Sequence, residues 1–150
     1  MRILIIEDDE NKRSQLLTFL EQDVPSAAVD TAGSLHSGLG KLLSAKYDLI
    51  LLDMTMPTFD VTADEGGGRP QPYGGRSLLR QMDRRGISTP VVVVTQFDRF
   101  GDADDALTLT ELESELALGH PRIYRGSVYY NATVESWKGQ LHGRIAEVLK

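Results

Sequence analysis

Three short apolar runs of the sequence are each followed by side chains that carry oxygen. In chain order these side chains are Asp8 with Asp9, Asp53 and Thr95. A run of about four residues that is apolar throughout is typical of a strand covered on both faces in a parallel sheet. Parallel sheets bind ligands just outside the carboxyl ends of their strands, so we expect these side chains to meet at one edge.

The chemistry that fits a cluster of these side chains is phosphoryl transfer at a metal site. Three crowded carboxylates raise one another's pKa unless a cation neutralises them. An all-oxygen cluster favours Mg²⁺, which typically takes one or two carboxylates with water and phosphate oxygens. Asp53 could then act as a nucleophile toward a phosphoryl group, and the Thr95 hydroxyl could donate to one of its oxygens. The alternative is that Asp53 only begins a turn, where Asp is common.

Strand patterns alternate with helix patterns along the chain. We expect strands over residues 3–6, 27–31, 49–52, 90–95 and 128–130, the last of which could extend back to 123. We expect helices over residues 11–22, 34–43, 76–85, 107–118 and 133–149. This alternation predicts a single doubly wound α/β domain of five parallel strands, with helices on both faces.

Two hydroxyl residues are expected to begin helices. Ser34 and Thr133 are good N-cap residues, because their side chains can accept a hydrogen bond from the first turn. Leucines follow Ser34 at helical spacing and predict the buried stripe of that helix, at positions 35, 39, 42 and 43.

Composition narrows the class of protein. The chain has 150 residues, no cysteine and a net charge of −6, so thiolate metal sites and disulfides are excluded. An acidic chain lacks the basic face that a sequence-independent grip on nucleic acid requires. Its longest apolar runs are four residues, and no leader pattern opens it, so we expect no membrane span and a cytoplasmic location.

The sequence resembles the receiver domain of two-component response regulators. The resemblance rests on the pair Asp8-Asp9 after an apolar strand, the segment LLDMTMP around Asp53, and the run VVVVT that ends at Thr95. The interval of 44 residues from Asp9 to Asp53 is the one the family shows. The resemblance covers essentially the whole chain and implies the flavodoxin-like strand order 2-1-3-4-5.

The resemblance also implies roles for individual residues. Asp53 is expected to be the phosphoacceptor, with Asp8 and Asp9 as metal-binding acids and Asp9 the better aligned of the two. The backbone carbonyl of Thr55 is expected to reach the metal, and Thr95 to reorient once the phosphoryl group is present. The implied partners are a histidine kinase or phosphotransfer protein and a downstream protein, without direct contact to nucleic acid or membrane. The resemblance leaves undecided whether the chain forms a homodimer. It implies no enzymatic turnover beyond slow self-dephosphorylation.

Two departures from the family pattern concern the second half of the chain. The family carries a Lys just after the last strand, where it pairs with the phosphoryl group, and no Lys stands there in this sequence. Asn131 is the expected occupant, with Arg125 as the alternative if the strand ends earlier. The sequence is also longer than the family pattern, which predicts an insertion at about 57–75 and an extended segment at about 98–127.

Two other classes of function compete with the phosphoacceptor. A pseudo-receiver would keep the fold and some of the acids but would not be controlled by phosphorylation, which the missing Lys favours. A phosphohydrolase of the haloacid dehalogenase type would need a second Asp two residues after the nucleophile, and Thr55 stands there instead.

Overall fold

The fold is known from a computed structural model. It describes residues 1–55, 57, 74–97, 99–100 and 107–149. The insertion expected at about 57–75 therefore lies almost wholly outside the described residues, and the extended segment at about 98–127 lies partly outside them.

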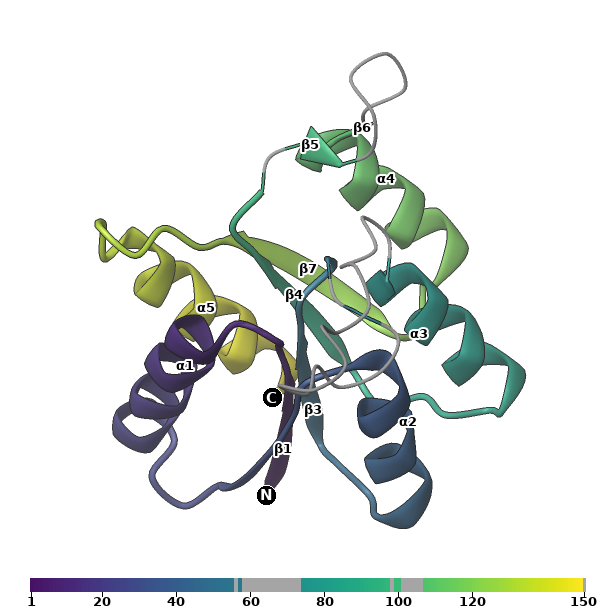
Figure 1. Cartoon of the computed structure of the whole chain (residues 1–150), viewed down its shortest axis with the longest axis horizontal. Helices are drawn as coiled ribbons and strands as arrows, with labels where there is room; N and C mark the ends of the chain where they lie inside the picture. The colour runs from purple at the N-terminus through teal and green to yellow at the C-terminus, as the bar shows by residue number, and fades with distance from the viewer. Residues whose placement is uncertain (56, 58–73, 98, 101–106, 150) are drawn as a thin grey trace, which may run out of the picture.

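Five parallel strands form one sheet in the order β2-β1-β3-β4-β7. They are β1 (Arg2–Ile6), β2 (Ala28–Ala32), β3 (Leu49–Leu52), β4 (Val91–Thr95) and β7 (Tyr124–Tyr129) (Figure 1). A separate antiparallel pair, β5 (Arg99–Phe100) and β6 (Leu107–Thr108), precedes the last strand of the sheet. Counting only the strands of the main sheet, the order is the expected 2-1-3-4-5, so the predicted fold class is confirmed.

Helices cover both faces of this sheet. On one face lie α1 (Glu10–Asp23) and α5 (Ser136–Val148); on the other lie α2 (Leu35–Ser44), α3 (Gly74–Arg84) and α4 (Leu109–Gly119) (Figure 1). In the described part of the chain, none of these helices is long and apolar enough to cross a membrane.

The central strands are apolar throughout because both of their faces are covered. Side chains of a strand point alternately to its two faces. Ile3 and Ile5 accordingly pack with α1 and α5, while Leu4 and Ile6 pack with α2, α3 and α4. All four side chains are fully buried, which holds the end of β1 rigidly beneath the acidic residues that follow it.

Two local predictions were wrong. Leu43 is 57% exposed, because only the Gly38 and Leu42 side of α2 faces the sheet. Thr133 does not cap the last helix, which begins at Ser136 without a side-chain cap bond. The Thr133 hydroxyl instead donates to Asn131 Oδ1 at 2.8 Å, so a polar turn separates β7 from α5. Ser34, in contrast, caps α2 as predicted, through a hydrogen bond from the Ser37 N–H.

The start of α3 lies directly against the segment that follows β3. The Gly75 N–H donates to the Met54 carbonyl at 2.9 Å. A Cβ at position 75 would lie 3.0 Å from Met54 Cα and 3.1 Å from the Asp53 carbonyl oxygen. Glycine therefore permits a close approach that holds the backbone around Asp53 in place.

Candidate functional site at the carboxyl edge of the sheet

The ends of β1 and β3 stand at the same level of the sheet. Ile6 lies opposite Leu52 in the parallel register, and the Asp53 N–H donates to the Ile6 carbonyl at 3.0 Å. The residue after each strand, Glu7 and Asp53, therefore leaves the sheet beside the other. Both side chains are buried, with exposed fractions of 2% and 5%.

Three carboxylates gather at this edge. One oxygen from each of Glu7, Asp8 and Asp53 lies within 4.8 Å of the others, close enough to share one metal ion. Asp9, predicted to bind the metal, has another partner here. It is the N-cap of α1, and its side chain accepts from the Lys12 N–H at 2.8 Å. The structure thus groups Glu7 with Asp8 and Asp53, where the sequence had suggested Asp9.

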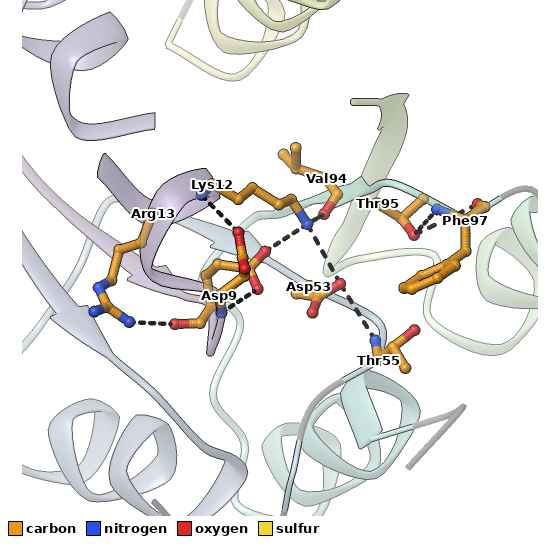
Figure 2. Close-up of polar contacts among 9 residues, drawn as sticks. Asp9, Lys12, Arg13, Asp53, Thr55, Val94, Thr95 and Phe97 are labelled. Carbon is orange, nitrogen blue, oxygen red and sulfur yellow. Dashed lines mark hydrogen bonds and ion pairs between the residues drawn. The ribbon is translucent and has the colours of Figure 1, made fainter. Parts of the chain in front are cut away.

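A buried lysine reaches the cluster from α1. Lys12 is 1% exposed, and its Nζ donates to the Val94 carbonyl at 2.6 Å and to Asp53 Oδ1 at 3.4 Å (Figure 2). The same atom lies 2.5 Å from Glu7 Oε1, without the alignment of a hydrogen bond. It also lies 5.8 Å from the centre of the Tyr130 ring.

Sequence reasoning missed both Glu7 and Lys12, although each left a signal. Glu7 is the residue immediately after an apolar strand, the same place that Asp53 holds after β3. Lys12 stands four and eight residues before Leu16 and Leu20, which puts a cation on the buried stripe of α1. A lysine in such a stripe is seldom buried unless it is paired, and so indicates an acidic partner in the interior.

Burial and charge set the protonation of the two deepest carboxyls. Burial raises the pKa of Glu7 to about 8, with the Lys12 ammonium lowering it and the Asp53 charge raising it. Burial also raises the pKa of Asp53, against the lowering effect of Lys12. With all groups ionised, the three carboxylates and one ammonium carry two net negative charges, which a divalent cation would neutralise.

Two of the predicted hydroxyl residues flank Asp53. The Thr55 N–H donates to Asp53 Oδ1 at 3.3 Å. Thr95 is fully buried at the end of β4, and its Oγ1 accepts from the Phe97 N–H at 3.1 Å (Figure 2). The hydroxyl is thus held at the edge of the site by a turn of the backbone.

Asn131 lies outside this group of contacts. Its Oδ1 accepts from the Thr133 N–H at 3.0 Å, and its side chain is exposed. Arg125, the alternative occupant of the Lys position, is the second residue of β7, so the early strand end that this alternative required does not occur.

A cavity of about 300 Å³ opens over Asp53. Its volume is that of several water molecules at roughly 30 Å³ each, enough for a hydrated ion and a phosphoryl group. Its walls are formed by Glu7, Asp8, Asp9, Glu10, Asp53, Thr55, Gln96 and Phe97.

The fold and this cavity define a flavodoxin-like α/β domain with an acidic site at the carboxyl ends of its strands. Residues 3–111 match the family model of the response regulator receiver domain. The chain belongs to this family, as the sequence resemblance predicted.

Similar proteins agree with this assignment. The chain is 34% identical to the Detocs response regulatory protein DtcB of Enterobacter cloacae over 150 residues, which cover 99% of this chain and 100% of that protein. It is 32% identical to the protein y4jR of Sinorhizobium fredii, over 92% of each chain. Among solved structures, the response regulator TrrA of Thermotoga maritima, in complex with Mg²⁺ and BeF, has a TM-score of 0.66 at 18% identity. That alignment covers 98% of this chain and 97% of the other, and shows a shared fold.

Proposed function

We propose that the chain is a stand-alone receiver domain that accepts a phosphoryl group on Asp53. The observation that carries the proposal is the cluster formed by buried Glu7 and Asp53 with half-buried Asp8, beneath an open cavity. Buried carboxylates are costly, so their concentration at the edge where parallel sheets bind ligands favours a functional role. The match to the Enterobacter cloacae response regulatory protein, which covers all of that protein, supports the assignment to response regulators.

The donor is a phosphohistidine of a histidine kinase or phosphotransfer protein. A carboxylate oxygen of Asp53 attacks the phosphorus atom and forms a new P–O bond. The P–N bond breaks, its electron pair stays with the imidazole nitrogen, and that nitrogen takes up a proton. The Thr55 N–H, 3.3 Å from Asp53 Oδ1, helps to orient the carboxylate for this attack. The Thr95 hydroxyl, at the end of the adjacent strand, is the group that would turn toward the phosphoryl oxygens.

The residues present fit Mg²⁺. Glu7, Asp8 and Asp53 offer hard oxygen ligands with the charge that a divalent ion needs, and the Thr55 carbonyl is the predicted fourth protein ligand. When bound, Mg²⁺ offsets the negative charge that builds on the transferring phosphoryl group. In this proposal Glu7 takes the place that sequence analysis assigned to Asp9.

Signalling proceeds through protein contacts in the cytoplasm. The net charge of −6 disfavours direct binding to nucleic acid, so the output of the domain is contact with a downstream protein. Chemistry at Asp53 is limited to accepting the phosphoryl group and losing it slowly to water.

One observation favours the pseudo-receiver as a second candidate. The Lys12 ammonium already pairs with Glu7 and Asp53, so the acidic site carries an internal counter-charge. A site whose negative charge is partly offset in this way can persist without phosphorylation.

Intact-mass measurement separates the two candidates. We expect the wild type to gain the mass of one phosphoryl group when treated with acetyl phosphate and Mg²⁺, and Asp53→Asn to gain none. Chelation of Mg²⁺ should strongly slow the gain. A wild-type chain whose mass stays unchanged under these conditions would reject the phosphoacceptor and leave the pseudo-receiver.

A further inference from the structure

Lys12 is a charged side chain buried in the core of this domain, with 1% of its surface exposed. A buried ammonium loses its hydration, and only close oxygen partners make up for that loss. The neighbours of Lys12 on the same stripe of α1, Leu16 and Leu20, are apolar, so a Met or Leu at position 12 would continue the helix face without this cost. The charge itself therefore needs an explanation.

The partners of Lys12 lie at the carboxyl ends of β1, β3 and β4, which are neighbouring strands in the sheet. Its Nζ contacts Glu7 after β1, Asp53 after β3 and the Val94 carbonyl within β4. A group bonded to Asp53 Oδ1 or Oδ2 would enter the cavity beside the ammonium, because Nζ lies 3.4 Å from Oδ1. Lysine carries three rotatable N–H donors, so one can stay on the Val94 carbonyl while another turns to a new acceptor.

The end of β7 cannot supply this charge. Tyr130 follows the strand and is 3% exposed, with its ring 5.0 Å from the Trp137 ring. Asn131 turns to Thr133. The buried Tyr130 side chain thus occupies the end of β7, after which the family's Lys would extend. Lys12 Nζ lies 5.8 Å from the centre of the Tyr130 ring.

We propose that Lys12, delivered from α1, is the cation that pairs with the phosphoryl group on Asp53. This inference rests on the proposed function. Before phosphorylation, Lys12 offsets part of the negative charge of Glu7 and Asp53 in the place where a metal would bind. After phosphorylation, it keeps the Val94 carbonyl and exchanges Asp53 Oδ1 for a phosphoryl oxygen. No further cation has to be buried, because the ammonium exchanges one anionic partner for another.

The proposal requires opposite effects on two ligands. Lys12→Met should weaken binding of beryllofluoride in the presence of Mg²⁺ by about tenfold or more, because a charge-assisted hydrogen bond is lost. The same change should tighten binding of Mg²⁺ alone by several-fold, because the ammonium no longer competes for the same carboxylates. Damage to the shape of the pocket would weaken both.

Calorimetric titration of the folded variants measures both affinities. Lys46→Met is the matched control: it removes one exposed positive charge just before β3, at the opposite edge of the sheet, and should change neither affinity by more than about twofold. If Lys12→Met does not fold, Lys12→Gln removes the charge while keeping a donor.

The outcomes separate this inference from the proposed function. A wild type that binds no beryllofluoride would overturn both. Equal beryllofluoride affinity in the wild type and Lys12→Met would overturn the role of Lys12 alone. Parallel loss of both affinities would show that Lys12 only shapes the pocket.

Discussion

The first three of four successive acidic residues have three different surroundings. Glu7 is buried, Asp8 is half-buried and Asp9 is exposed. The difference arises where the chain leaves β1 and enters α1. Glu7 still points along the strand end toward Asp53, whereas Asp9 has turned to accept a hydrogen bond from the first turn of the helix. One carboxylate therefore serves the site and another serves the helix, although both are acids of the same short segment.

Binding of Mg²⁺ distinguishes these roles. Glu7→Gln should weaken Mg²⁺ binding by about tenfold or more, because a charged ligand of the cluster becomes neutral. Asp9→Asn should leave the affinity within about twofold, because Asn is as good an N-cap as Asp and the carboxylate lies outside the cluster. Calorimetry on the two variants measures this. A large loss in Asp9→Asn with none in Glu7→Gln would restore the assignment made from the sequence.

Among the elements, α3 holds the backbone that carries Asp53. Its first turn packs on the backbone of Asp53 and Met54 through Gly75. Both residues are buried, so the surrounding core leaves the segment little room to shift. The position of Asp53, the proposed phosphoacceptor, thus depends on a helix that begins more than twenty residues later in the sequence.

Gly75→Ala should destabilise the domain by about 1–2 kcal/mol, because the added methyl group meets backbone atoms in a packed core. Better helix propensity offsets part of this loss. The matched control is Gly143→Ala in α5, where nothing lies within 4 Å of the added Cβ. That change should stabilise the domain by roughly 0.5–1 kcal/mol. Denaturant unfolding measures both, and a more stable Gly75→Ala would show that Met54 yields freely.

At the scale of the whole molecule, the carboxylate of Asp30 links three segments of the chain at one side of the sheet. Asp30 of β2 accepts from Arg2 of β1 at 2.9 Å and from the Tyr47 hydroxyl, before β3, at 2.6 Å. The hydrogen bond from Tyr47 lowers the pKa of Asp30. Three segments are joined through one carboxylate, so its charge contributes to the stability of the fold.

The contribution of Asp30 depends on pH in a defined direction. Because its pKa is lowered in the folded state, the stabilisation is present above the unfolded value of about 3.9 and is lost as the pH falls through the folded value. Asp30→Asn should therefore lower the free energy of unfolding by about 0.5–1 kcal/mol near pH 7, a modest value because the group is partly exposed. The difference from the wild type should diminish as the pH falls below the unfolded value. Unfolding curves across this range test it, and a difference independent of pH would show that charge plays no part.

The sequence by itself determined the architecture and placed Asp53 at the carboxyl end of a strand. Runs such as Leu49–Leu52 are apolar on both faces, and only a covered parallel strand satisfies such a pattern. The strand order and the edge at which Asp53 lies then followed from the alternation of strands with helices and from the family resemblance. Predictions from local patterns were wrong where tertiary contacts decide the outcome. Leu43 was predicted to be buried and is exposed, and Thr133 was predicted to cap the last helix and bonds to Asn131 instead.

Only the tertiary structure decided which charges meet. Asp8 and Asp9 are adjacent in the sequence, and which acid points at Asp53 depends on the turn between β1 and α1. Lys12 lies 41 residues before Asp53, and its helical stripe shows only that it faces the core. The packing of α1 across the strand ends selects its partners, because an ammonium buried there must find the nearest oxygens.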